Sequence, residues 1–205
     1  MKKIPLLLLS YLFISAPEGY ALASEKSTVL ITGSNRNIGL EFVKQFSKAG
    51  WRVIATTRSI DSADELIEFS KQNQNVIVEQ LDITNDQHLK NLKKKYEDDA
   101  IDILLNNAAY TPRYFSSFRG IGGVDIEATR KSFEINSIGT MKVIQTFIEN
   151  VEQSENGKIV NLSTKAASFD ERPKIPMMYS YAMSKAALNS MIKTLSFETI
   201  ESEII

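Results

Sequence analysis

The sequence predicts an α/β fold, a doubly wound parallel sheet with helices on both faces, from three observations. Short apolar segments without polar alternation, typical of strands buried on both faces, alternate with amphipathic segments of about ten residues or more. A helix between consecutive strands implies right-handed crossovers and parallel pairing. Each strand-like segment is followed by polar or small residues, and the carboxyl ends of parallel strands are where such sheets bind ligands.

The first strand and helix surround a glycine loop, Gly33-Ser34-Asn35-Arg36-Asn37-Ile38-Gly39. The apolar run 29–31 predicts the strand, and apolar residues at mixed three and four spacing predict a helix over 38–49. Asn37 stands where a third glycine could stand, and Asn tolerates a left-handed backbone. Free N–H groups at a helix start and close backbone approach at glycines suit a pyrophosphate. The alternative is an ordinary strand-to-helix turn.

The remaining elements follow the same alternation. We expect strands at 51–57, 76–81, 101–105 and 158–162, helices at 62–72, 86–96, 125–153 and 179–200, and a loop at 110–124. There is no internal repeat or linker, so residues 24–205 form one domain.

The first 23 residues have the pattern of a signal peptide. Lys2 and Lys3 precede an apolar run over 4–16, and Ala21-Leu22-Ala23 forms an A-x-A cleavage site. The run is short of the roughly 20 residues that span a membrane. We therefore expect cleavage after Ala23 and export to the periplasm or medium. The alternatives are an uncleaved anchor or a start codon placed too far upstream, with the protein in the cytoplasm.

Composition excludes several kinds of site. The chain has 24 Lys and Arg against 25 Asp and Glu, which gives no reason to expect nucleic acid or an acidic membrane as a partner. It has no cysteine, which excludes disulfides, thiolate chemistry and zinc–cysteine sites. The single histidine, His88, lies in a polar helix start, where we expect it to be solvated. A Ser-His-Asp triad or a multi-histidine metal site would depend on it alone.

Tyr181 and Lys185 share one face of the last predicted helix, because they are four residues apart. A cation about 4 Å from a phenol contributes up to about 4 kcal/mol at a dielectric near 20, or roughly three pKa units. We therefore expect a lowered pKa that makes Tyr181 a proton donor and acceptor. Tyr179 has no lysine in the equivalent position. The alternative is an aromatic residue and a lysine on a surface helix.

Five ordered motifs resemble those of the short-chain dehydrogenase/reductase family. They are the Thr32-Gly33 to Gly39 loop, Asn106-Asn107-Ala108-Ala109, Asn136, Ile159 to Thr164, and Tyr181 to Lys185. The run from Met178 to Asn189 is similar to that of the carbonyl-reductase-like branch. The resemblance covers 28–205 and implies a Rossmann-like sheet, NAD(P)(H) and hydride transfer between nicotinamide and a carbonyl or alcohol carbon.

The resemblance also implies roles for the matching residues. Tyr181 would protonate the nascent alkoxide, Lys185 would lower the pKa of Tyr181 and bind the nicotinamide ribose, and Asn136 would anchor a relay water. The substrate oxygen would be held by Thr164 or by Ser163 before it, a choice that the sequence leaves open. The expected cofactor contacts are Gly33, Asn35, Arg36, Asn37, Ile38, Gly39, Arg58, Asp82, Ile83, Asn107, Ala108, Ala109, Tyr181 and Lys185, with Asp82 at the adenine.

The charges near the second strand predict NADP(H) over NAD(H). An acidic residue at that strand end would bind the ribose 2′-hydroxyl and repel a 2′-phosphate. The segment 55–58 has none, and it ends in Arg58, while Arg36 lies in the glycine loop. Two guanidinium groups suit a phosphate.

Two functions remain open. One is an NADP(H)-dependent oxidoreductase acting on a small carbonyl or alcohol, whose identity would depend on the loop 110–124. The other is a non-catalytic nucleotide-binding or scaffold protein. Intact Tyr181, Lys185 and Asn136 argue for the first, because a binding module has no need of a tuned phenol. Possible export argues for the second, as does the end of the chain at the start of a sixth strand, Glu203-Ile204-Ile205, where the family continues with substrate-covering segments. By resemblance we expect a homodimer or homotetramer formed through the long helices.

Overall fold

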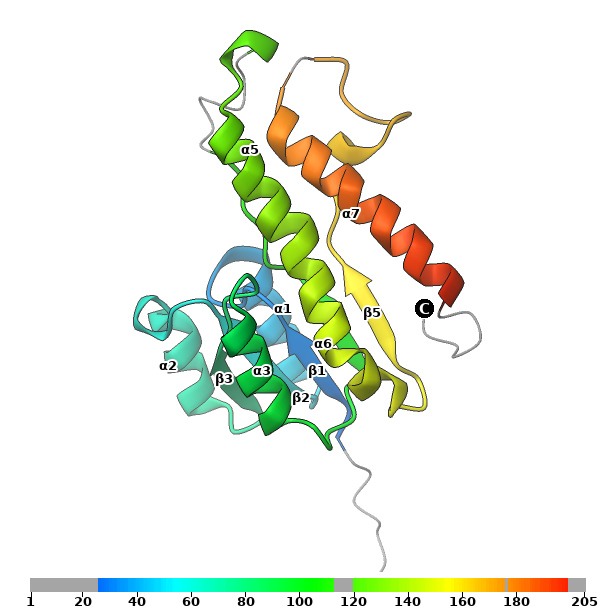
Figure 1. The fold of residues 1–205 in the computed structure, drawn as a ribbon. Coiled ribbons are helices and arrows are strands. Elements are labelled where there is room, and N and C mark those ends of the chain that lie inside the picture. Colours follow the sequence, from blue (N-terminus) through cyan, green and yellow to red (C-terminus); the bar gives the residue numbers. More distant parts are fainter. Residues whose placement is uncertain (1–25, 113–119, 176, 199–205) are drawn as a thin grey trace, which may run out of the picture.

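The computed structural model describes residues 26–112, 120–175 and 177–198. The predicted signal peptide, the predicted sixth strand and residues 113–119 of the predicted substrate loop lie outside these residues. Five parallel strands form one sheet in the order β3-β2-β1-β4-β5 (Figure 1). Their bounds are β1 Thr28–Ile31, β2 Arg52–Thr57, β3 Val76–Gln80, β4 Ile103–Asn106 and β5 Lys158–Asn161. This confirms the predicted doubly wound sheet.

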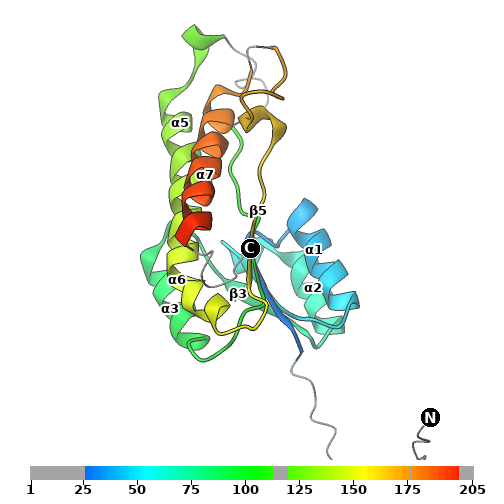
Figure 2. The ribbon, with the colours of Figure 1, turned by 90° about the vertical axis from the view of Figure 1, so that its right-hand side faces the viewer.

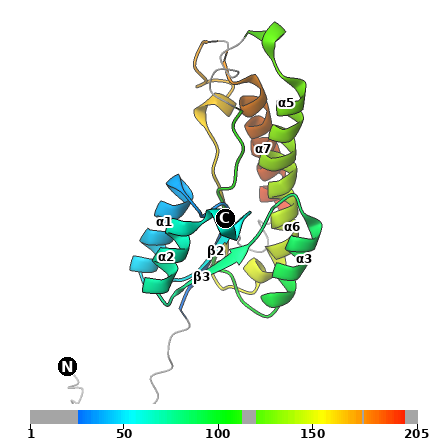
Figure 3. The ribbon, with the colours of Figure 1, turned by 90° about the vertical axis from the view of Figure 1, so that its left-hand side faces the viewer.

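Helices cover both faces of the sheet. Figures 2 and 3 show α1 (Asn37–Lys48) and α2 (Asp64–Gln72) on one face, and α3 (Asp86–Lys95), α6 (Thr140–Glu152) and α7 (Tyr179–Glu198) on the other. Each strand contributes side chains to the core on both faces of the sheet, because successive residues point to opposite faces. Leu30 and Leu104 pack toward Phe147 of α6, whereas Val29 and Ile31 pack toward Val43 of α1.

The long helix predicted over 125–153 is interrupted. It consists of α5 (Ile126–Phe133), a π-helical turn, η3 (Glu134–Gly139), and α6. Gly139 lies against the turn after β3, where an added Cβ would be 2.9 Å from Ile83 Cγ1. Such a turn depends on tertiary packing, and π-turns occur frequently at functional sites. Asn136 lies within this one.

Four other predictions need correction. β4 begins at Ile103 and not at Ile101, because the backbone N–H of Ile101 donates to Asn150 O, outside the sheet. A short 3-10 turn, η1 (Ile60–Ser62), replaces the start of the helix predicted at 62–72. A second one, η2 (Ile121–Gly123), replaces part of the loop predicted at 110–124. His88 is half-buried rather than solvated, and its Nδ1 accepts a hydrogen bond from Asp82 N at 3.1 Å.

β5 pairs with β4 alone among the described strands. Its side chains are more exposed than those of β1, with Val160 at 36%. Within the described residues, no helix combines the length and apolar character that crossing a membrane requires.

Candidate active site

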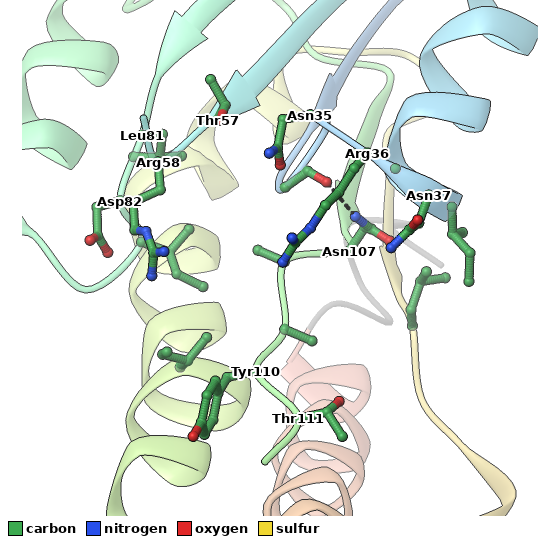
Figure 4. Close-up of a pocket in the computed structure, with 18 of the residues that line it drawn as sticks. Asn35, Arg36, Asn37, Thr57, Arg58, Leu81, Asp82, Asn107, Tyr110 and Thr111 are labelled. Carbon is green, nitrogen blue, oxygen red and sulfur yellow. Dashed lines mark hydrogen bonds between the residues drawn. The ribbon is translucent and has the colours of Figure 1, made fainter. Parts of the chain in front are cut away.

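The carboxyl ends of the strands border a cleft of about 750 Å³ (Figure 4). Every residue predicted to contact the cofactor lines this cleft, including Tyr181 and Lys185, and Ser163 lines it as well. Of the predicted catalytic residues, Asn136 and Thr164 do not line it. The fold therefore brings together side chains from both halves of the chain.

The glycine loop has the backbone that close packing requires. Gly33 has φ 69°, and an added Cβ would lie 2.8 Å from Ala108 Cα. A Cβ on Gly39 would lie 2.1 Å from Gly33 O. Only a glycine at position 39 therefore lets the start of α1 pack this closely against the loop. Asn37 has φ 50°, which confirms that an asparagine adopts the left-handed conformation here.

The start of α1 presents backbone N–H groups to the cleft. Its N-cap, Arg36, makes no side-chain capping hydrogen bond, whereas the α3 N-cap Asn85 accepts from two backbone N–H groups. Helix starts need partners for these groups and favour negative charge. This arrangement fits a pyrophosphate.

Asn107 ties the end of β4 to the glycine loop. Its Nδ2 donates to Thr32 O at 3.0 Å and to Gly33 O at 2.8 Å. Thr32 Oγ1 accepts from the backbone N–H groups of Asn107 and Ala108. The Asn107 side chain thus fixes the shape of the loop.

Two arginines and one carboxylate line the cleft where β1, β2 and β3 end. Figure 4 shows Arg58 beside Asp82, with Arg36 entering from the glycine loop. Partial burial by itself raises the pKa of Asp82, but hydrogen bonds from Thr84 and the charge of Arg58 outweigh it, so the pKa is lowered. Asp82 therefore stays ionised and is oriented by the Thr84 N–H and hydroxyl at 3.0 and 2.7 Å.

Asn136 is fully buried and joins three elements. Its Oδ1 accepts from Tyr110 N at 2.7 Å, and its Nδ2 donates to Tyr110 O at 2.9 Å and to Ser184 Oγ at 2.9 Å. Ser137 Oγ in the same turn donates to Ser184 O. Asn136 therefore holds the segment after β4 against α7.

Tyr181 and Lys185 line the same cleft from α7. Lys185 is 2% exposed, and its Nζ donates to Leu162 O at 2.8 Å. Burial lowers the pKa of Lys185 to about 8. The Tyr181 phenol is half-buried, and the loss of solvent raises its pKa. The predicted lowering by Lys185 is therefore wrong.

A sequence model described as short chain dehydrogenase matches residues 27–205. An uncharacterized oxidoreductase from Schizosaccharomyces pombe is 34% identical over 173 residues, which are 82% of this chain and 66% of the relative. The chain belongs to the short-chain dehydrogenase family. It spans about two thirds of the length of that relative.

Solved structures share the family fold. A short-chain dehydrogenase/reductase structure from Burkholderia multivorans with bound NADP is 25% identical, with a TM-score of 0.76 over 87% of this chain and 76% of that one. The NADPH-bound carbonyl reductase from chicken fatty liver is 23% identical, with a TM-score of 0.76 over 88% and 74%. At 23% identity, the second likeness shows the fold alone.

The two hydroxyl candidates of this family member differ in position and bonding. Ser163 lines the cleft, and its Oγ donates to Asn189 Oδ1 at 2.6 Å. Thr164 Oγ1 accepts from Ala166 N at 3.3 Å, at the start of the 3-10 turn η4 (Lys165–Ala167). The Thr164 hydroxyl proton has no acceptor among the described residues, whereas that of Ser163 is engaged.

Sequence reasoning missed several residues that line the cleft. They include Tyr110, Thr111, Lys131 and Ile135. Tyr110 directly follows the Asn-Asn-Ala-Ala motif, and this position could have indicated its place in the cleft. No motif marks Lys131, since its position depends on how α5 packs.

The buried Lys185 predicts a pH dependence of stability. Between about pH 8 and its ordinary pKa of 10.5, the unfolded chain binds more protons than the folded chain. The free energy of unfolding should therefore rise from about pH 8 to about pH 10, where Tyr181, with its raised pKa, is still neutral. Urea unfolding across this range measures the rise. Lys185→Met should flatten it, and equal slopes in variant and wild type would contradict the assignment.

Proposed function

We propose that this short-chain dehydrogenase family member is an NADP(H)-dependent oxidoreductase acting on a small carbonyl or alcohol. One observation carries the proposal. Tyr181 and Lys185, on one face of α7, line the same cleft as the glycine loop, Arg36 and Arg58. A phosphate site and a proton donor thus lie in one continuous space.

The residues of the cleft fit the cofactor. The uncapped start of α1 would hold the pyrophosphate, Arg36 and Arg58 a 2′-phosphate, and Asp82 the adenine. Lys185 would bind the nicotinamide ribose. The nicotinamide, when bound, supplies or accepts the hydride.

The protein supplies the proton. In reduction, the substrate carbon gains a hydride and its oxygen gains the Tyr181 phenolic proton, which gives the alcohol. Reduction needs Tyr181 in its protonated form, and the raised pKa keeps the phenol protonated at neutral pH. Ser163 and Thr164 both stay candidates to donate to the carbonyl oxygen, because Ser163 lines the cleft and the Thr164 hydroxyl proton has no acceptor among the described residues.

Cofactor binding to the full chain tests the proposal. NADPH should bind, as followed by its fluorescence, and should be oxidised with an activated carbonyl. Arg58→Glu removes one cation from the proposed phosphate site and adds a negative charge. It should weaken NADPH binding by about tenfold or more and NADH binding by less than about threefold, because a charged hydrogen bond contributes roughly 1.5–3 kcal/mol. Equal losses would contradict the preference for NADP(H).

A non-catalytic nucleotide-binding role is the second candidate. It is favoured by β5, which among the described strands pairs on one side only. NADPH binding without turnover would support this role. Turnover would exclude it.

A further inference from the structure

One cation in the cleft has no place in the proposed cofactor site. The charged residues that line the cleft are Arg36, Arg58, Lys131 and Lys185 against a single carboxylate, Asp82. The two arginines and Asp82 are assigned to the adenosine end and Lys185 to the nicotinamide ribose. Lys131, on α5, is left over.

Lys131 is not neutralised by its helix neighbours. Among the described residues, no carboxylate lies within ion-pair distance of it, although Glu127 and Glu134 are one turn away on either side. Glu127 pairs with Arg130 at 3.4 Å, and Glu134 lies 4.0 Å from Lys142. The Lys131 charge is therefore available to a ligand.

Lys131 contacts an aromatic ring at the cleft. Its Nζ lies 4.8 Å from the centre of the Tyr110 ring, within the range of a cation–π contact. Both backbone polar groups of Tyr110 are bonded to the buried Asn136, so the residue is anchored. Figure 4 shows the Tyr110 ring beside the helix and apart from Arg58 and Asp82.

Resting on the proposed function, we propose that Lys131 is a specificity-determining residue that binds a carboxylate on the substrate. The substrate class is then an aldehyde or ketone with a carboxylate at its other end. Tyr110 holds the Lys131 ammonium at the cleft wall, and the reacting carbonyl lies toward Tyr181. A single monovalent cation suits a carboxylate better than a phosphate, which would need further donors.

A binding experiment tests this without turnover. The melting temperature and the Kd of the full chain are measured with glutarate and with the uncharged pentane-1,5-diol, in the presence and absence of NADPH. Glutarate should stabilise the protein in both conditions and the diol should not. Lys131→Met should weaken glutarate binding by about fivefold, the upper range for an exposed ion pair, while Lys131→Arg retains it.

Lys193→Met is the matched control. Lys193 Nζ lies 4.7 Å from the Phe197 ring, a similar contact on α7, and Lys193 does not line the cleft. This variant should bind glutarate as the wild type does. Glutarate binding that is unchanged in Lys131→Met, or that is abolished by NADPH, would overturn the proposal. An NADPH affinity lost in Lys131→Met would instead assign Lys131 to the cofactor.

Turnover separates this proposal from the one on which it rests. With NADPH, succinic semialdehyde should be reduced with a kcat/KM about fivefold above that of butanal, and Lys131→Met should remove the difference through KM. Equal rates for the two aldehydes would overturn the role of Lys131 and leave the reductase intact. Failure to bind NADPH would overturn the reductase, while glutarate binding would still report on Lys131.

Discussion

Tyr181→Phe is expected to lower kcat by about a thousandfold while the protein still folds and binds NADPH. A positioned acid contributes roughly 10²- to 10⁴-fold, and phenylalanine keeps the ring but lacks the proton. The half-buried ring would still line the cleft beside Lys185, so cofactor affinity should change by less than about threefold. The rate of NADPH oxidation measures the loss of kcat, and a fluorescence titration with NADPH measures the unchanged affinity.

Tyr179→Phe is the control for this prediction. Tyr179 begins the same helix, and its side chain does not line the cleft. The same chemical change there should leave kcat within about twofold. If Tyr181→Phe retained wild-type kcat, Tyr181 could not be the acid, and the proposed mechanism would be wrong.

The strands and the glycine turn could be predicted because their signals are local. Apolar runs of strand length, each followed by a helical period, are sufficient to predict a parallel sheet. The positive φ of Asn37 follows from its place in a loop that needs a left-handed residue. The grouping of the predicted cofactor residues could also be predicted, because the carboxyl ends of parallel strands lie at one edge of the sheet.

Features that depend on distant contacts could not be predicted. The π-turn at Glu134–Gly139 lies against Ile83, from another part of the chain, and the start of β4 depends on Asn150. The direction of the Tyr181 pKa depends on burial, which helical spacing does not reveal. The environment of Lys131 depends on the ring of Tyr110, which α5 meets only in the folded protein.

The sequence and the structure indicate different roles for Asn136. The family resemblance implies that Asn136 anchors a relay water, whereas in the structure its amide joins Tyr110 to Ser184 of α7. Both roles predict a loss of activity when the amide is removed. They differ in stability, since only the structural role leaves buried polar groups without partners.

Asn136→Ala should therefore lower both stability and activity. The Tyr110 N–H and C=O and the Ser184 hydroxyl would each lose a partner, which we expect to destabilise the protein by about 3 kcal/mol. The kcat/KM should fall about a hundredfold, because small displacements of catalytic groups have effects of that size. Urea unfolding and NADPH oxidation, both run at a temperature where the variant stays folded, measure the two losses.

Asn150→Ala separates the effect on the site from the effect on stability. Asn150 is also fully buried, and its amide likewise makes three hydrogen bonds, to Tyr96 O, Asp99 O and Lys93 Nζ, away from the cleft. It should lose a similar amount of stability but keep kcat/KM within about threefold. If both variants lost activity in proportion to stability, Asn136 would matter only for folding. A loss confined to Asn136→Ala would mean that the Tyr110 to α7 connection positions the catalytic groups.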